Sequence, residues 1–162
     1  MPRWLMRGLI TVRYRVGPST VAGAGKGFFV AENIRAGHIL IAPTNATHTV
    51  RLAEIFSPQS HPHAASSVVW FEDHCVVSPD YPDDFFINHS FTPNAVWHLG
   101  FVFALRDLEA GEELLLDYRH LIAPGVPLDF RDGATGEEIV GHTWKDSLRI
   151  TSQQVLALTD RM

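Results

Sequence analysis

The sequence has little of three features that would narrow its class at once: cysteine, long apolar runs and clustered positive charge. Its single cysteine, Cys75, excludes an internal disulfide and a Cys-rich zinc module. No run approaches the roughly 18 apolar residues of a membrane-spanning helix. Arg3 and Arg7 fall where a signal peptide would be apolar. We therefore expect no signal peptide, no membrane span and a cytoplasmic location, with the nucleus as an option in a eukaryote.

Charge and composition place the chain among acidic globular proteins. Lys and Arg number 13 against 18 Asp and Glu, for a net charge of −5. This balance, without a basic block, disfavours direct binding to nucleic acid. Hydrophobic residues make up 46%, and 162 residues suffice for one domain with a sizeable core. The 12 glycines and 10 prolines are spread along the chain, which favours a mainly β fold with few short helices.

Hydrophobic periodicity predicts mostly strands. Residues 10–16 alternate between apolar and polar, the pattern of a half-buried strand. The segment 121–150 is predicted to be rich in loops, and Thr151 fits the N-cap of a short C-terminal helix, with Gln154 three residues later. Further strands are predicted at 28–31, 39–41, 68–71, 75–78, 95–105 with a break at Gly100, and 114–116.

Two segments 74 residues apart resemble one another. Asn33–Leu40 and Asp107–Leu114 each combine a capping-type residue, an aliphatic residue, Ala-Gly and a leucine three residues later. Each pattern is typical of a turn in which glycine supplies a positive φ before a strand. Two interpretations stay open, a coincidence of two common turns or a real internal correspondence. The spacing is too long for a solenoid repeat.

Three segments carry chemistry-bearing residues. Ala24-Gly-Lys-Gly-Phe28 exposes backbone groups to a ligand, but a strand follows it where a dinucleotide-binding loop needs a helix; the alternative is a simple hairpin turn. Asn88-His-Ser-Phe-Thr-Pro-Asn94 offers donors and acceptors at a turn; the alternative is a self-satisfied turn. In Gly111-Glu-Glu-Leu-Leu-Leu-Asp-Tyr118 an apolar triplet ends in an acid and a phenol; the alternative is a strand with a tyrosine at its rim.

Together and in this order, the three segments resemble the SET domain, the family of S-adenosylmethionine-dependent protein lysine methyltransferases. Gly25-Lys-Gly27 followed by Ile34-Arg-Ala-Gly37 is similar to the family's N-terminal pattern. The signature Asn-His-Ser-x-x-Pro-Asn is intact at 88–94, and Gly-Glu-Glu-Leu-x-x-x-Tyr is present at 111–118. The resemblance covers about residues 12–120.

The resemblance implies a β-clip fold of small, curved antiparallel sheets. In that fold the Asn-His-Ser segment passes beneath the loop around Tyr118 in a knot-like crossing. The resemblance also implies a SET core at 1–120 with a variable insert at about 44–74. Residues 121–162 would then form a lid-like C-terminal segment that ends in a short helix.

The resemblance further implies S-adenosylmethionine as the methyl donor, no metal, and a substrate lysine that enters a channel from the face opposite the donor. Tyr118 would be the catalytic residue, and Trp97 would line the channel with it. The residues that would hold the donor, several of them through their backbone, are Ala24, Lys26, Gly27, Phe28, Asn88, His89 and Trp144.

The chain departs from the family at several positions. Because a Cys-rich module that closes the donor site in many relatives is absent, we assign Trp144 as the lid, with Phe130 as the second candidate. Trp97 stands where the family usually has Tyr or Phe, which leaves the number of methyl groups open. His61 and His63 carry only a weak metal signal, since no Cys or carboxylate follows at ligand spacing.

The expected partner is a lysine-containing protein or peptide. An acidic loop containing Asp80, Asp83 and Asp84 could steer a basic peptide, the alternative being an ordinary solvated loop. Two further readings are a catalytically weak or inactive SET-fold protein that binds a partner, and a methyltransferase for small amines. Because the chain has little room for a separate recognition module, self-association into a homodimer is expected to complete the site.

Overall fold

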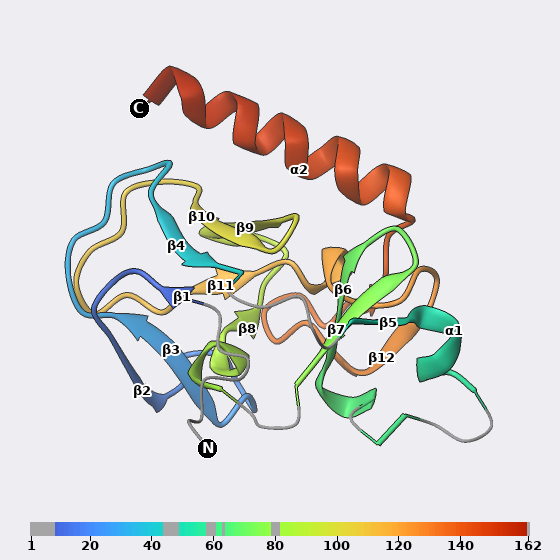
Figure 1. Ribbon diagram of the computed structural model, residues 1–162. Helices are drawn as coiled ribbons and strands as arrows, with labels where there is room; N and C mark the ends of the chain where they lie inside the picture. The colour runs from blue at the N-terminus through green and yellow to red at the C-terminus, as the bar shows by residue number, and fades with distance from the viewer. Residues whose placement is uncertain (1–8, 44–48, 58–60, 63, 79–81, 162) are drawn as a thin grey trace, which may run out of the picture.

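The computed structural model describes residues 9–43, 49–57, 61–62, 64–78 and 82–161. Asp80 and His63, considered above, lie outside the described residues. Strands are arranged in several small, mostly antiparallel sheets with few helices, which confirms the predicted mainly β fold. In Figure 1 the sheets form the body of the molecule, and α2 (Trp144–Leu158) lies across the top, above β9 (Ala95–His98) and β10 (Phe101–Ala104).

The largest sheet among the described residues has four antiparallel strands in the order β1-β4-β10-β9. A turn at Gly100, with φ of 91°, separates β9 from β10 where the sequence predicted a break. Side chains of this sheet, among them Leu40 and Val102, lie in the main core. The four strands are β1 (Leu9–Ile10), β4 (Ile39–Ala42), β9 (Ala95–His98) and β10 (Phe101–Ala104).

A second sheet consists of β2 (Tyr14–Pro18) and β3 (Lys26–Val30). The alternation predicted over 10–16 is confirmed in burial, since Val12 is buried while its neighbours on both sides are exposed. The segment is not one strand, however. Its start pairs with β4 as β1, and its end pairs with β3 as β2, so the chain passes from one sheet to the other within a single apolar face.

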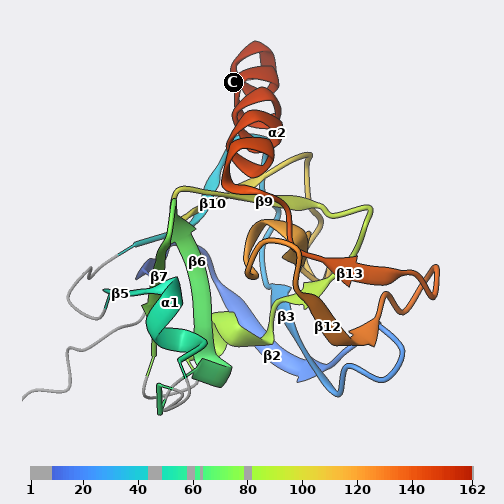
Figure 2. The same cartoon turned by 90° about the vertical axis from the view of Figure 1, so that its right-hand side faces the viewer.

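Three strands among the described residues between 49 and 77 form a separate antiparallel sheet in the order β5-β7-β6. Its strands are β5 (Thr49–Arg51), β6 (Ser67–Phe71) and β7 (His74–Val77), accompanied by α1 (Leu52–Ile55) and the 3-10 turn η1 (Ala64–Ser66). Figure 2 shows this sheet on one side of the molecule and the hairpin of β12 (Pro127–Arg131) and β13 (Glu138–Val140) on the other. The sheet has its own small core of Ile55, Val69, Cys75 and Val77.

The two similar turns found in the sequence face each other. Ile34 and Leu108 exchange both backbone hydrogen bonds, each at 2.9 Å. The side chain of Asn33 accepts a hydrogen bond from the backbone N–H of Ala110 at 2.9 Å, and Asp107 accepts one from Ala36 at 2.8 Å. The correspondence is therefore a real local two-fold arrangement, in which each turn caps the other.

One pair of short strands is parallel: β8 (Asn88–His89) lies beside β11 (Leu115–Leu116). The 3-10 turn η2 (Asp83–Phe86) precedes β8, and the 3-10 turn η3 (Tyr118–His120) follows β11. This pairing places the second and third sequence signatures side by side, as the predicted crossing requires.

The segment 121–150 is more regular than predicted. Pro127–Arg131 (β12) and Glu138–Val140 (β13) pair as an antiparallel hairpin. Helix α2 then runs for 15 residues and is followed by the 3-10 turn η4 (Thr159–Arg161). Within the described residues, no helix combines the length and the apolar character needed to cross a bilayer.

The predicted N-cap of the C-terminal helix is wrong. Thr143 caps α2, because its Oγ1 accepts a hydrogen bond from the backbone N–H of Asp146 at 3.1 Å. Thr151 instead lies buried in the middle of the helix and donates to the carbonyl of Ser147 at 2.8 Å. Both threonines are followed three residues later by a side chain that suits a capping box, and only the packing of Thr151 against His98 distinguishes them.

We expect Thr143→Ala to lower the free energy of unfolding by about 1 kcal/mol, the usual cost of losing an N-cap side chain. The measurement is urea unfolding followed by circular dichroism. Gln153→Ala, at an exposed position of α2, is the matched control and should change stability little. Equal stability of the Thr143→Ala variant and the wild type would show that the cap does not hold the helix start.

Candidate functional site

The three signature segments meet in one place. Strand β3 lies beside residues 112–114, where the backbone N–H of Leu114 donates to the carbonyl of Phe28 at 2.8 Å. The parallel pair of β8 and β11 then brings Asn88 next to this junction. Residues far apart in the sequence are thus held together by backbone hydrogen bonds.

At the centre of this junction lies the buried carboxylate of Glu113, whose residue is 5% exposed. It accepts hydrogen bonds from Ser19 Oγ at 2.6 Å, from the backbone N–H of Thr20 at 2.6 Å, from the Thr20 hydroxyl, and from Asn88 Nδ2 at 3.0 Å. Burial alone would raise the pKa of Glu113, but the hydrogen bonds from Ser19, Thr20 and Asn88 outweigh it and lower the pKa. The group is therefore a buried anion with a full set of donors.

Glycine is required at position 27 by the approach of this carboxylate. A Cβ at Gly27 would lie 2.7 Å from Cδ of Glu113, closer than real Cβ contacts come. The neighbouring loop is closed by hydrogen bonds from the backbone N–H of Ser19 to Gly25 and of Ala24 to Val21. Of the residues predicted to hold the donor, Ala24, Lys26, Gly27 and Phe28 therefore lie along one hairpin beside Glu113.

The side chain of Asn88 is oriented by this hairpin and by Glu113. Its Nδ2 donates to the carbonyl of Lys26 at 2.8 Å as well as to the carboxylate of Glu113. Among the described residues, no hydrogen bond reaches its Oδ1, and the residue is half-buried. The amide oxygen is thus available as an acceptor for a ligand N–H or O–H.

His89 connects this junction to Tyr118. Its Nδ1 accepts a hydrogen bond from the backbone N–H of Tyr118 at 3.1 Å. Its Nε2 is buried and lies 3.7 Å from Oδ1 of Asp132 in the turn of the β12–β13 hairpin. Burial is the main cause of the lowered pKa of His89. The ring is therefore a neutral spacer between β8, the turn of Tyr118 and the hairpin.

Tyr118 is held by both its backbone and its side chain. Its hydroxyl donates to the carbonyl of Ile87 at 2.6 Å, and burial raises the pKa of the phenol to about 12. The phenol is consequently neutral near pH 7, and its proton is committed to Ile87. The lone pairs of its oxygen are left to accept a hydrogen bond.

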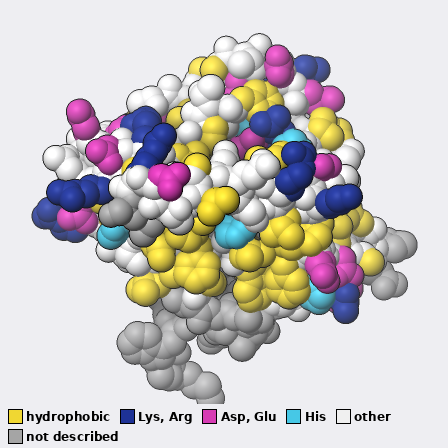
Figure 3. Space-filling view, turned by 90° about the horizontal axis from the view of Figure 1, so that it is seen from above, with side chains coloured by type: hydrophobic (Ala, Val, Ile, Leu, Met, Phe, Trp, Pro, Cys, Tyr) yellow, Lys and Arg dark blue, Asp and Glu magenta, His cyan; other side chains and the backbone are white. Residues whose placement is uncertain are grey.

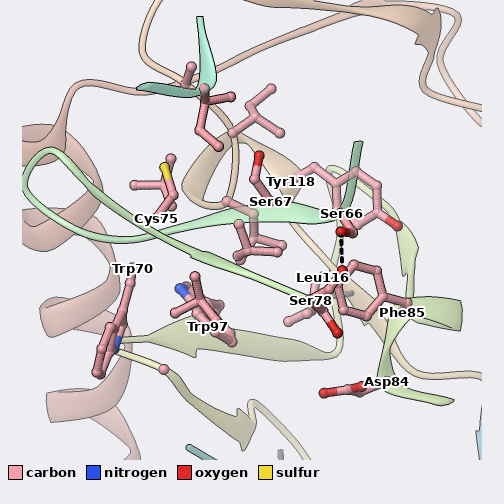
Figure 4. Close-up of a pocket in the computed structure, with 18 of the residues that line it drawn as sticks. Ser66, Ser67, Trp70, Cys75, Ser78, Asp84, Phe85, Trp97, Leu116 and Tyr118 are labelled. Atoms are coloured by element: carbon pink, nitrogen blue, oxygen red, sulfur yellow. Dashed lines mark hydrogen bonds between the residues drawn. The ribbon is translucent and has the colours of Figure 1, made fainter. Parts of the chain in front are cut away.

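Tyr118 and Trp97, the two predicted channel residues, line one cavity of about 750 Å³. The close-up in Figure 4 shows Tyr118 and Phe85 on one side and Trp97 and Trp70 on the other. The walls are mostly apolar and come from the β5-β7-β6 sheet with its neighbouring turns, from β9 and β10, and from the segment after Tyr118. None of the residues predicted to hold the donor lies among the lining residues, so the cavity is separate from the Glu113 junction.

The lid candidates lie in different places. Trp144 is half-buried at the start of α2 and does not line the cavity, and its predicted role at the donor site stays a prediction. Phe130 does line the cavity and lies edge-on to Tyr118, with ring centroids 6.4 Å apart. At the turn of the same hairpin, a Cβ at Gly133 would lie 3.1 Å from Cγ1 of Val21. The β12–β13 hairpin therefore reaches from the cavity to the glycine-rich loop.

A polar cluster next to Tyr118 was not identified from the sequence. Arg119 binds the carboxylate of Asp117 through Nε at 2.9 Å and Nη2 at 2.5 Å, and stacks on Phe91 at 4.6 Å. The rings of His120 and His142 lie 5.0 Å apart, and burial is the main cause that lowers the pKa of His120 to about 4. The spacing of Asp117 and His120, three residues apart, is the one sequence signal of this cluster, since His142 comes from the far end of the hairpin.

The acidic residues before β8 are used in part within the fold. Asp83 accepts a hydrogen bond from the hydroxyl of Tyr14 at 2.7 Å, and Asp84 lines the cavity.

Seen from above, hydrophobic side chains gather in the lower half of Figure 3, while charged ones are spread over the remainder of that face.

Comparison with known proteins identifies one family and one similar fold. A family model described as the SET domain matches residues 25–119. A chain of the solved structure titled "ctPRC2 in an autoinhibited conformation bound to S-adenosylmethionine" is similar in fold, with a TM-score of 0.52 and 20% identity. The alignment covers 82% of the present chain and 20% of that chain, so the present chain matches about a fifth of its length. No curated protein sequence matches the chain.

The tight fit at Gly27 generates a paired prediction. We expect Gly27→Ala to unfold at a lower temperature than the wild type, because its Cβ would displace the buried carboxylate of Glu113. Gly17→Ala is the matched control: it lies opposite Gly27 in the same strand pair, and its Cβ would meet only the mobile end of Arg15 at 2.7 Å. Melting temperatures from calorimetry decide the matter. Equal melting temperatures for the two variants would contradict the account of Glu113.

Proposed function

This chain belongs to the SET domain family, and we propose that it transfers a methyl group from S-adenosylmethionine to the side-chain amine of a lysine in a protein. One observation carries the proposal. The phenol of Tyr118 forms part of the wall of an apolar cavity, while the backbone of the same residue is bonded to His89, the neighbour of Asn88. The residues that we assign to the acceptor and those that we assign to the donor are therefore linked through Tyr118.

The residues around Glu113 fit the donor. At Gly25 a Cβ would meet nothing within 4 Å, so the backbone of this loop is open to a ligand, and the free Oδ1 of Asn88 provides an acceptor for a ligand amine. Asn88 and the hairpin of Ala24, Lys26 and Phe28 would hold it. When bound, S-adenosylmethionine supplies a methyl group that is already activated on a sulfonium, so that the protein's contribution is binding, alignment and exclusion of water.

The cavity residues suit the acceptor. A free lysine amine has a pKa of about 10.4 and is charged near neutral pH, whereas methyl transfer requires its lone pair. An apolar lining disfavours the charged form. Because the Tyr118 hydroxyl donates to Ile87, its oxygen can accept a hydrogen bond from the amine and orient the lone pair away from it. Arginine would be a poor acceptor, since its pKa is above about 12.

Trp97 favours a second candidate function. Its indole lines the cavity with Tyr118 and takes up space that a methylated amine would need. If that space is too small for turnover, the chain would act as a module that binds a partner through the same cavity. Methyl transfer by the purified protein to any protein or peptide of a broad panel would exclude this alternative, and the number of methyl groups on the product would report the room that Trp97 leaves.

For the acceptor side, we expect Tyr118→Phe to reduce methyl transfer by roughly 10- to 100-fold, the effect of losing one hydrogen bond of about 1.5–3 kcal/mol to the reacting group. The measurement is incorporation of labelled methyl into a peptide panel. Binding of S-adenosylhomocysteine, measured by calorimetry, should stay close to that of the wild type. A Tyr118→Phe variant with wild-type turnover would remove Tyr118 from the catalytic step.

For the donor side, we expect the wild type to bind S-adenosylhomocysteine and Asn88→Ala to bind it at least about tenfold more weakly, since about 1.4 kcal/mol corresponds to that factor. Calorimetric titration measures both. Because Asn88 also donates to Glu113, the melting temperature without ligand must be recorded, so that weaker binding is compared only between folded proteins. Wild-type protein that binds no S-adenosylhomocysteine would overturn the proposed donor site.

A further inference from the structure

The polar cluster beside Tyr118 has the composition of a metal site. One ligand atom each from Asp117, His120 and His142 lies within 4.8 Å of the other two. The side chains of Asp117 and His120 are 8% and 4% exposed, so two of the three groups are buried. Two imidazoles and a carboxylate are donors that zinc and other first-row divalent metals prefer.

The orientation of His120 points to a ligand. Its Nδ1 lies 2.9 Å from the hydroxyl of Ser147 in α2. Its Nε2 lies 3.9 Å from Oδ2 of Asp117, too far for a hydrogen bond, and no described residue binds it. Metal-binding histidines usually donate their second ring N–H to a fixed acceptor, which leaves the other nitrogen as a ligand. Ser147 can serve as that acceptor, and Nε2 then faces the cluster with its lone pair.

The other two residues are held in place around the same point. The backbone N–H of His142 donates to the carbonyl of Arg119 at 2.8 Å, which positions its ring beside His120. Arg119 binds the carboxylate of Asp117, an arrangement common for carboxylates that ligate a metal. The positive charge of Arg119 opposes the binding of a cation. However, its guanidinium stacks on the ring of Phe91, and its side chain is 33% exposed.

We propose that Asp117, His120 and His142 form a binding site for a divalent first-row transition metal, for which Zn²⁺ is the probe. Tetrahedral zinc with bonds of about 2.0–2.2 Å needs ligand atoms roughly 3.3 Å apart, so side-chain movements of about an ångström would close the site. A water molecule would complete the coordination. The site takes no part in the proposed methyl transfer, and it departs from the sequence expectation of no metal.

The proposed ion would connect two parts of the C-terminal half of the chain. Asp117 and His120 flank Tyr118 in the turn after β11, whereas His142 lies between β13 and α2. A shared metal would therefore fix the end of the β12–β13 hairpin to the turn that carries Tyr118. Because a ligand that binds only the folded state stabilises it, bound metal should raise the melting temperature.

The experiment uses full-length protein without a histidine tag, freed of metal with a chelator and titrated with Zn²⁺ near neutral pH. Calorimetry gives the stoichiometry and affinity, and thermal melting gives the stabilisation. We expect one equivalent of zinc to bind and to raise the melting temperature. His142→Ala, which alters a half-buried ring, should weaken this binding at least tenfold and remove the thermal shift while the metal-free melting temperature stays close to that of the wild type.

His74→Ala is the matched control, because Glu72, Asp73 and His74 form the other cluster of metal-type ligands in the described chain, and two of these three residues are exposed. This variant should bind zinc as the wild type does. Wild-type protein that binds no zinc, or a His142→Ala variant that binds it unchanged, would overturn the site. Both measurements are made without S-adenosylmethionine or substrate, so their failure is distinct from failure of the proposed methyl transfer.

Discussion

The junction of the three signature segments depends on one buried charge, the carboxylate of Glu113. An ionised carboxylate removed from water is very costly unless hydrogen bonds replace its hydration. Glu113 obtains its donors from Ser19, Thr20 and Asn88, which lie 94, 93 and 25 residues away along the chain. The carboxylate also requires a position without a side chain at Gly27. Satisfying Glu113 therefore brings three distant segments into contact, and the proposed donor site lies at that contact.

The second requirement is to separate the Glu113 junction from the cavity while linking the two. Parallel pairing of β8 with β11 does this, because Asn88 faces the Glu113 junction whereas Tyr118, just beyond β11, turns toward the cavity. The ring of His89 fills the space between them and accepts the N–H of Tyr118. The Glu113 junction and the apolar cavity are thus linked through this short strand pair, since Asn88 of β8 binds Glu113 and Leu116 of β11 lines the cavity.

Hydrophobic alternation and turn motifs predicted those elements that depend on neighbouring residues in the sequence. Alternation over 10–16 gave the correct buried face, and two similar turns proved to cap each other. The start of α2 was misassigned because Thr143 and Thr151 have equivalent local patterns, and only burial against β9 excludes the second. The cluster of Asp117, His120 and His142 was not predicted, because His142 reaches it only through the β12–β13 hairpin. The segment that forms this hairpin contains several glycines, and none of them gives a distinct turn signal.

The C-terminal helix is held by different contacts from those that hold the junction around Glu113. Helix α2 docks through hydrogen bonds of His98 with Thr151 and of His120 with Ser147, each at 2.9 Å, and through the buried side chain of Leu158. Hydrogen bonds of this kind contribute about 1 kcal/mol each, whereas leaving a buried charge such as Glu113 without one of its donors costs more than that. In the cavity wall Phe130 packs edge-on against Tyr118, whereas Tyr118 is also held by the hydrogen bonds of its hydroxyl to Ile87 and of its backbone N–H to His89. Any ligand that strengthens the contacts around His120 would act on the turn that carries Tyr118 and, through the hydrogen bond from the Tyr118 N–H to His89, on β8 beside Glu113 as well.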